Sequence, residues 1–248
     1  MIENSILKAN REGRKALAFA LVFPSLHLIE LAAHVGFDSI NLDGEHGYFN
    51  EQAIDDACRV ANGYGMSVTA RVPDIAPYQI NLYLDRGIQG VTGPHIETGA
   101  QAQALADACL FPPDGKRSWG GGRGTEFNDD VVLNEKYGGK LQFAKWSNAN
   151  MIVTAQIESK KAWDNLDDIL AVKGLTGVTG GPNDFAASLG FPGQPDHPDR
   201  VAATLDVEKR ARAAGKTAGG RSAGTGAAEL MLGEARRFVA EHRNDKLS

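Results

Sequence analysis

Short apolar runs rich in Val, Ile, Leu and Ala alternate with longer helix-like segments along this chain. The helix-like segments begin at Ser, Thr or Asn and end at Gly or Pro, as Ser25 and Gly36 do, which is what helix capping prefers. Strands that alternate with helices are typical of βα units and a parallel sheet. The length of 248 residues is that of one (β/α)8 barrel. We therefore predict an α/β fold, a (β/α)8 TIM barrel that forms a single domain over residues 1–248.

The alternation can be followed from end to end except in one region. Between 112 and 150 the chain is rich in turn-forming residues, and only 134–150 has a weak helical pattern. Arg117, Trp119 and Arg123 make a function for this loop plausible, with a plain surface loop as the alternative. The predicted strands are 17–24, 39–45, 67–73, 88–96, 150–159, 175–184, 216–220 and a short one near 228–233. The predicted helices are 25–36, 50–65, 76–87, 98–111, 160–174, 197–215 and one in the tail.

Composition excludes several classes of protein. The formal charge is -5 and no block of Lys and Arg is present, so we expect no nucleic-acid partner. No apolar run approaches the roughly 18 residues needed to cross a bilayer, so we expect no membrane partner. Cys58 and Cys109 both lie in helical patterns, which favours two buried, reduced thiols and a cytoplasmic protein.

Charged or polar side chains follow four of the predicted strands, at 41–46, 69–73, 155–159 and 179–184. Glu158 and Asp184 are one strand–helix–strand step apart, since 184 − 158 is 26, so they should meet at one edge of the sheet. Carboxylate oxygens suit hard cations such as Mg²⁺ or Mn²⁺. We predict a metal site there, with a helix cap or salt bridge as the alternative for each residue. Gln156 should point the same way as Glu158, because side-chain direction repeats every two residues along a strand.

The other strand ends carry candidates for proton transfer and anion binding. His46 is the predicted general acid or base, with Asp43 as the carboxylate that orients it. Arg71 suits an oxyanion or carboxylate, although pairing with Asp or Glu is the alternative. Asp85 stands at a helix end where its charge opposes the macrodipole, which suggests a role elsewhere. Five other histidines lack such a context and are expected to be structural or exposed: His27, His34, His95, His197 and His242.

Together these segments resemble the HpcH/HpaI aldolases, the metal-dependent class II pyruvate aldolases. The resemblance lies in the ordered segments 36–47, 70–73, 84–91, 111–117, 156–159 and 181–190. It implies a barrel of the phosphoenolpyruvate/pyruvate superfamily and a homo-hexamer, a dimer of trimers with exchanged C-terminal helices. The chain departs from the family in being short after Lys216. The resemblance implies Glu158 and Asp184 as ligands of Mg²⁺, Mn²⁺ or Co²⁺, His46 and Asp43 as a catalytic dyad, Arg71 as the enolate-binding arginine and Gln156 as a substrate contact. We also expect Asp85 to be catalytic and Pro182 and Asn183 to contact the substrate.

The implied reaction joins a 2-oxo acid, such as pyruvate or hydroxypyruvate, to an aldehyde through an enolate. The aldehyde pocket is expected to be shaped by the loop 112–130 and a neighbouring subunit. A Schiff-base aldolase is disfavoured because no lysine lies inside a predicted strand. Three alternatives remain open: an oxaloacetate decarboxylase, an acyl-CoA lyase that would use the loop Arg117–Arg123, and a non-catalytic protein that binds 2-oxo acids.

Overall fold

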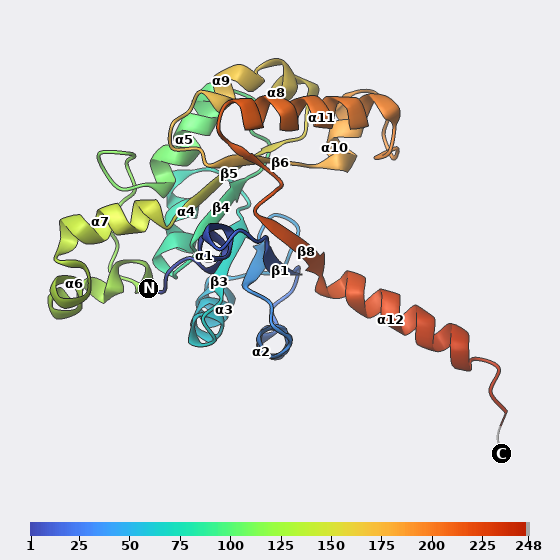
Figure 1. Cartoon of the computed structure of the whole chain (residues 1–248), viewed down its shortest axis with the longest axis horizontal. Helices are drawn as coiled ribbons and strands as arrows, with labels where there is room; N and C mark the ends of the chain where they lie inside the picture. The colour runs from blue at the N-terminus through green and yellow to red at the C-terminus, as the bar shows by residue number, and fades with distance from the viewer. Residues whose placement is uncertain (247–248) are drawn as a thin grey trace.

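The structure is a computed structural model and describes residues 1–246. Eight parallel strands form one curled sheet, in the order β7-β6-β5-β4-β3-β2-β1-β8, with helices on its outer face (Figure 1). This arrangement confirms the predicted α/β fold of TIM-barrel type. The strands are β1 (Ala16–Leu21), β2 (Ser39–Asp43), β3 (Ser67–Arg71), β4 (Gly90–Gly93), β5 (Ile152–Ile157), β6 (Gly177–Gly180), β7 (Thr217–Ala218) and β8 (Ser222–Gly226).

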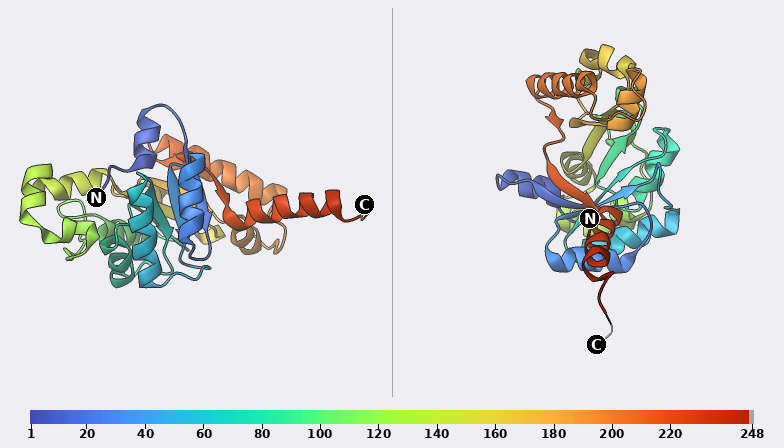
Figure 2. Two further views of the ribbon diagram at one scale, coloured as in Figure 1. Left: turned by 90° about the horizontal axis from the view of Figure 1, so that it is seen from below. Right: turned by 90° about the vertical axis from the view of Figure 1, so that its right-hand side faces the viewer.

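Most helices return the chain along the outside of the sheet, as two perpendicular views show (Figure 2). The predicted Ser25 cap is present, since its hydroxyl accepts the backbone N–H of Leu28, and the Thr98 hydroxyl accepts the backbone N–H of Gln101 in the same way. No helix within residues 1–246 has the length and apolar character needed to cross a bilayer. The helices are α1 (Ser5–Arg11), α2 (Leu26–Val35), α3 (Glu51–Gly63), α4 (Pro77–Asp85), α5 (Gly99–Cys109), the 3-10 helix η1 (Arg123–Asn128), α6 (Asp130–Tyr137), α7 (Lys140–Ala149), α8 (Lys160–Asp164), α9 (Leu166–Leu170), α10 (Pro182–Ser188), α11 (Pro198–Ala213) and α12 (Ala227–His242).

Three predicted elements were wrong in their type or their continuity. The expected helix over 134–150 is interrupted at Gly138 and Gly139, whose positive φ angles of 83° and 107° lie in the left-handed region. The helix expected over 160–174 is likewise two short helices, α8 and α9, which meet at Asn165. The strand expected near 228–233 is the first part of α12, because Ala, Glu, Leu and Met are strong helix formers.

The sheet is open between β7 and β8. Only residues 219–221 join these strands, whereas two parallel neighbours need a connection of about a dozen residues or more. The chain therefore passes directly from one edge to the other: β7 pairs with β6, and β8 pairs with β1. The short stretch after Lys216 thus leaves a curled sheet with eight strands and two free edges.

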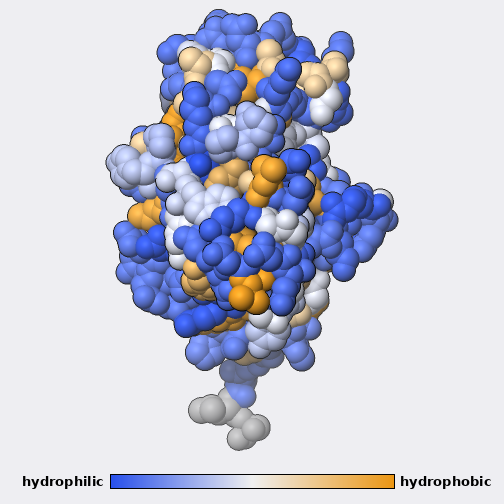
Figure 3. All heavy atoms as spheres, turned by 90° about the vertical axis from the view of Figure 1, so that its left-hand side faces the viewer, coloured by the Kyte–Doolittle hydropathy of each residue, from blue (hydrophilic) through white to orange (hydrophobic). Residues whose placement is uncertain are grey.

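The hydrophobic core lies between the strands and the outer helices. Most apolar side chains of β1 to β6 that face these helices are fully buried. The face drawn in Figure 3 is mostly hydrophilic, with small separated apolar patches. Cys58 and Cys109 are free and buried, as predicted. Burial raises the pKa of both thiols, that of Cys109 to about 12, so both side chains are uncharged at neutral pH.

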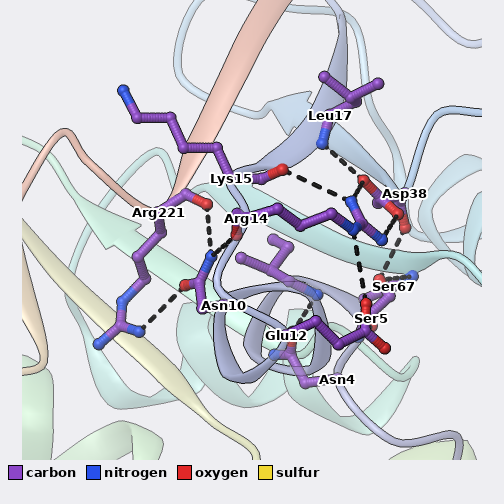
Figure 4. A network of polar contacts seen from close by, with 11 residues as sticks. Asn4, Ser5, Asn10, Glu12, Arg14, Lys15, Leu17, Asp38, Ser67 and Arg221 are labelled. Atoms are coloured by element: carbon purple, nitrogen blue, oxygen red, sulfur yellow. Dashed lines mark hydrogen bonds and ion pairs between the residues drawn. The ribbon is translucent and has the colours of Figure 1, made fainter.

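A polar network fastens the N-terminal segment to the amino end of the sheet, where Ser5 bonds Ser67 and Arg14 bonds Asp38 (Figure 4). The fully buried Asn4 donates from Nδ2 to the carbonyl oxygens of Gln89 and Asn150, at 3.0 and 2.9 Å. Its Oδ1 accepts the backbone N–H groups of Ile6 and Leu7 and so caps α1. Because Gln89 and Asn150 precede β4 and β5, this segment covers the end of the sheet opposite to the polar strand ends.

Replacing Asn4 with Ala should therefore lower the free energy of unfolding by about 2–4 kcal/mol, since the change removes a helix cap and leaves buried carbonyl groups unpaired. Urea unfolding followed by circular dichroism would measure the loss. A change below about 0.5 kcal/mol would contradict this account of the network.

Candidate active site

The carboxyl ends of the strands bring together most of the predicted site residues. Asp43 ends β2 and is paired in register with Arg71, which ends β3. Glu158 directly follows β5, and Asp184 lies in the first turn of α10, directly after β6. Because parallel strands end at the same edge, side chains distant in the sequence meet here.

Arg71 is held by two carboxylates. Its Nε and Nη2 donate to Oδ1 and Oδ2 of Asp43, at 3.0 and 2.6 Å. Its Nη1 lies 2.9 Å from Oε2 of Glu45. Burial by itself would raise the pKa of Asp43, but the hydrogen bonds from Arg71 and from the backbone N–H of His46 outweigh it, and the pKa lies below its usual value. The guanidinium is thereby fixed in one orientation at the rim of the sheet.

His46 is near the site, but its ring does not contact Asp43. Oδ1 of Asp43 accepts the backbone N–H of His46 at 3.2 Å, so the carboxylate fixes the turn that carries the histidine. The ring is exposed, and its Nε2 lies 3.9 Å from Oε2 of Glu45. The orientation of the ring by Asp43 is thus not present in this structure, and the catalytic role of His46 stays a prediction.

Glu158 is a buried carboxylate next to other negative charges. Its side chain is only 3% exposed, and its Oε2 accepts a hydrogen bond of 2.6 Å from Nε2 of Gln156, which shows that the two side chains point the same way. Burial raises the pKa of Glu158; the backbone and ring of His95 oppose this, and the charges of Asp184 and Glu45 raise it further. A bound cation would compensate this crowding of negative charge.

The oxygen donors fit a divalent metal ion. A Cβ at Gly181 would lie 2.1 Å from Oε2 of Glu158, so only glycine leaves that oxygen accessible from this side. Asp184 is exposed in the same short segment, near enough for its charge to raise the pKa of Glu158. Within residues 1–246, no three His, Cys, Asp or Glu side chains already surround one point as a metal cage. Two carboxylates with water or substrate oxygens are a donor set that suits Mg²⁺ or Mn²⁺.

His95 is a site residue that the sequence analysis missed. Its Nδ1 lies 2.9 Å from Oε1 of Glu158, and its Nε2 lies 2.9 Å from Oε1 of Glu45. We expected His95 to be structural or exposed. This expectation was wrong because the strand predicted over 88–96 is longer than the strand in the structure. β4 ends at Gly93, which places His95 beyond the strand end, where the other polar residues gather. The sequence signal that could have identified His95 is its position directly after Gly93 and Pro94, because such a pair typically ends a strand.

A cavity of about 440 Å³ extends from these residues into the curled sheet. Asp43, Arg71 and Gln156 line it at the polar end, and Ile6 lines it at the opposite end. One threonine from each of β3 to β6 lines the wall, together with apolar residues such as Val91 and Val178. The volume of the cavity is that of a small-molecule site.

Comparison with known proteins agrees with this geometry. The model of the family described as HpcH/HpaI aldolase/citrate lyase matches residues 21–241. The chain belongs to this family. It is 34% identical over 238 residues to a 4-hydroxy-2-oxovalerate aldolase of Rhodococcus jostii, which covers 96% of the chain and 88% of that protein. It is also 34% identical to a hydroxypyruvate/pyruvate aldolase of Roseobacter denitrificans, with 96% and 90% covered.

Solved structures show the same fold. An HpcH/HpaI aldolase from Desulfitobacterium hafniense superposes with a TM-score of 0.84 at 22% identity, over 97% of each chain. A family protein from Burkholderia cenocepacia also has a TM-score of 0.84, at 25% identity. The relatives named as aldolases match this chain over nearly its whole length. This HpcH/HpaI protein is therefore a carbon–carbon lyase.

One predicted residue of this family member is not brought to the site. Asp85 ends α4, which runs from the carboxyl end of β3 back toward the start of β4, so it lies at the amino end of the sheet. The loop 112–130 packs there, and a Cβ at Gly120 would lie 2.4 Å from Oδ2 of Asp85. Arg117 is buried in the same place and stacks on the ring of Phe111. Within one chain, neither Asp85 nor the loop contributes to the cavity's polar end.

Proposed function

We propose that this HpcH/HpaI protein is a divalent-metal-dependent aldolase, which reversibly adds pyruvate or a related 2-oxo acid, such as hydroxypyruvate, to an aldehyde. The product would be a 4-hydroxy-2-oxo acid. The observation that carries the proposal is the buried Glu158, which lies beside Asp184 and His95 and hydrogen-bonds Gln156, a residue that lines the cavity together with Arg71. Relatives named as aldolases of hydroxypyruvate/pyruvate and of 4-hydroxy-2-oxovalerate support the substrate class.

Each residue has a role in this proposal. Glu158 and Asp184 would hold Mg²⁺, Mn²⁺ or Co²⁺, which when bound supplies a Lewis acid for the keto oxygen of the 2-oxo acid. Arg71, already fixed by Asp43, donates to that oxygen as negative charge develops on it. His46 accepts the proton from C3 of the 2-oxo acid.

Three further residues would contact the substrate. Gln156 lines the cavity and hydrogen-bonds Glu158, so it can present its amide to a substrate oxygen. Pro182 and Asn183 are exposed beside Asp184 in the first turn of α10, where they would be accessible to a substrate. An acyl-CoA substrate is disfavoured, because Arg117 is buried against the ring of Phe111 and Arg123 pairs with Asp55, so neither guanidinium is free to bind a phosphate.

The test uses pyruvate in D₂O with the purified protein and Mn²⁺ or Mg²⁺. We expect loss of the C3 methyl proton signal in the NMR spectrum, loss of this exchange after EDTA treatment, and recovery on adding the cation back. Borohydride with pyruvate should leave the protein active, because no lysine adduct forms. Exchange that persists without metal, or trapping of a lysine, would refute the proposal. Pyruvate release from oxaloacetate without any aldehyde addition would indicate a decarboxylase instead.

We further propose that the chain acts as a homo-oligomer, a hexamer in which α12 packs on another subunit. α12 extends away from the rest of the molecule (Figures 1 and 2). It exposes a row of apolar side chains that an isolated chain would leave in water: Leu230, Met231, Leu232, Phe238 and Val239. In such a hexamer, Asp85 and the loop 112–130 of one subunit would lie next to the active site of a neighbouring subunit.

Replacing Met231 and Phe238 together with Asp should therefore produce a smaller particle, because charges on this face prevent its burial. Light scattering coupled to size-exclusion chromatography would measure the mass, with a monomer of about 26 kDa expected. Arg236→Asp, also on α12, is the charge-matched control and should keep the native mass. An unchanged mass of the double variant would argue against the role of α12.

A further inference from the structure

The cavity inside the curled sheet has a second guanidinium at its amino end. Arg221 is the last residue of the short connection between β7 and β8, and it lines the cavity beside Ser222 and Ile6. Its backbone is fixed there, because its carbonyl oxygen accepts the backbone N–H of Ala16 at 3.0 Å and Nδ2 of Asn10 at 2.8 Å. Since Ala16 begins β1, Arg221 lies at the end of the sheet opposite to the candidate active site (Figure 4).

The Arg221 guanidinium is half-buried and has no acidic partner within residues 1–246. Its side chain makes one hydrogen bond, from Nη1 to Oδ1 of Asn10, at a long 3.4 Å. Its Nε is enclosed and has no partner. Burial lowers the pKa of Arg221, and no neighbouring carboxylate opposes this effect. A buried guanidinium is costly unless it is paired, so an anion that bound here would remove that cost.

The arginine at the other end of the cavity is different. Arg71 also lines the cavity, but Asp43 and Glu45 hold its fork and offset its charge. The positive charge that stays uncompensated along the cavity wall is therefore that of Arg221. A planar guanidinium matches the geometry of a carboxylate or a phosphate group, so an anion inside the cavity should bind at the amino end.

The surroundings of Arg221 leave room for a ligand. Gly219 and Gly220 line the same part of the cavity and carry no side chain that could fill it. The hydroxyl of Ser222 adds a group that can donate to an anionic oxygen. The whole cavity, at about 440 Å³, is large enough for a small organic molecule.

We propose that the amino end of this cavity is a binding site for a small anion with a carboxylate or phosphate group, held by the fork of Arg221. This site is separate from the strand ends that carry the proposed aldolase chemistry. It needs no metal ion, because the guanidinium itself supplies the positive charge.

The test is calorimetry with inorganic phosphate on the purified protein in EDTA, which removes any cation from the strand ends. The native protein should bind one phosphate per chain, and Arg221→Gln should weaken binding by about tenfold or more, because it loses charge-assisted hydrogen bonds. Arg14→Gln is the matched control. Arg14 belongs to the same network, but Asp38 already accepts from its Nη1 and Nη2, at 2.7 and 2.8 Å, so phosphate affinity should stay within about twofold.

Acetate added as a competitor identifies the anionic group. Displacement of phosphate would show that the site also takes carboxylates, and no displacement would restrict it to phosphate groups. Both results support an anion site at Arg221.

Three results would overturn the inference. They are no phosphate binding by the native protein in EDTA, an unchanged affinity in Arg221→Gln, and loss of binding in Arg71→Lys, which would place the anion at the other end of the cavity. If Arg221→Gln does not fold, native crystals soaked in selenate decide the question: an anomalous peak is expected at Arg221, and a peak at Arg71 alone would contradict the site. None of these results bears on metal dependence, which the proton exchange of pyruvate tests separately.

Discussion

Replacing Glu158 with Gln should reduce kcat/KM for aldol cleavage by about 10³-fold or more. The change removes the negative charge that we propose binds the cation but keeps the shape and a polar contact with Gln156. A Lewis acid contributes several kcal/mol to the stabilisation of the developing oxyanion, and each 1.4 kcal/mol is about tenfold in rate. The measurement is pyruvate release from a 4-hydroxy-2-oxo acid, followed through lactate dehydrogenase, together with Mn²⁺ titration calorimetry.

Glu97→Gln is the matched control for this experiment. Glu97 pairs with Lys161 and accepts from Ser159, close to the site but outside the cavity, so its replacement should leave kcat/KM within about threefold. Glu158→Gln that keeps a tenth of the native activity, with Mn²⁺ binding unchanged, would exclude Glu158 as a ligand.

Replacing Arg71 with Lys should lower kcat by about 10²–10³-fold, although the positive charge is retained. Arg71 makes two parallel hydrogen bonds to Asp43 and a third contact with Glu45, and an ammonium group cannot reproduce this fork. Loss of one preorganised oxyanion donor typically costs this factor in kcat. Steady-state kinetics should show the effect mainly in kcat, because Arg71 acts on charge that develops during the reaction.

Arg86→Lys provides the comparison. Arg86 pairs with Glu51 on the outer helices, far from the cavity, and its replacement should leave kcat nearly unchanged. A loss confined to KM in Arg71→Lys would show that Arg71 binds the substrate without stabilising the transition state.

The open edge between β7 and β8 does not remove the site. Asp43, Arg71, His95, Glu158 and Asp184 follow β2 to β6, which are consecutive neighbours in the sheet. The edge strands β7 and β8 contribute no residue to this set. The proposed site therefore does not require a barrel that is closed by its last two strands.

Much of the site could be predicted from the amino-acid sequence, because the patterns that place its residues at the strand ends are local. Alternation of strands and capped helices indicated a parallel sheet, and parallel strands end at one edge, which places Asp43, Arg71 and Glu158 together. The two-residue period of a strand was enough to predict that Gln156 and Glu158 point the same way, as the hydrogen bond between them shows. These conclusions need only backbone geometry and residue order.

Only the tertiary structure decided which side chains turn toward one another at the carboxyl ends of the strands. His95 bridges Glu45 and Glu158, whereas the ring of His46 lies away from Asp43, because the conformation of a loop beyond a strand depends on contacts with its neighbours. Asp85 lies at the opposite end, since the direction of α4 carries it away from the strand ends. By itself the sequence determined the order of strands and the chemistry at their tips, which are short-range properties. The meeting of particular atoms across strands, and the free edge at β8, follow from long-range packing that no local pattern encodes.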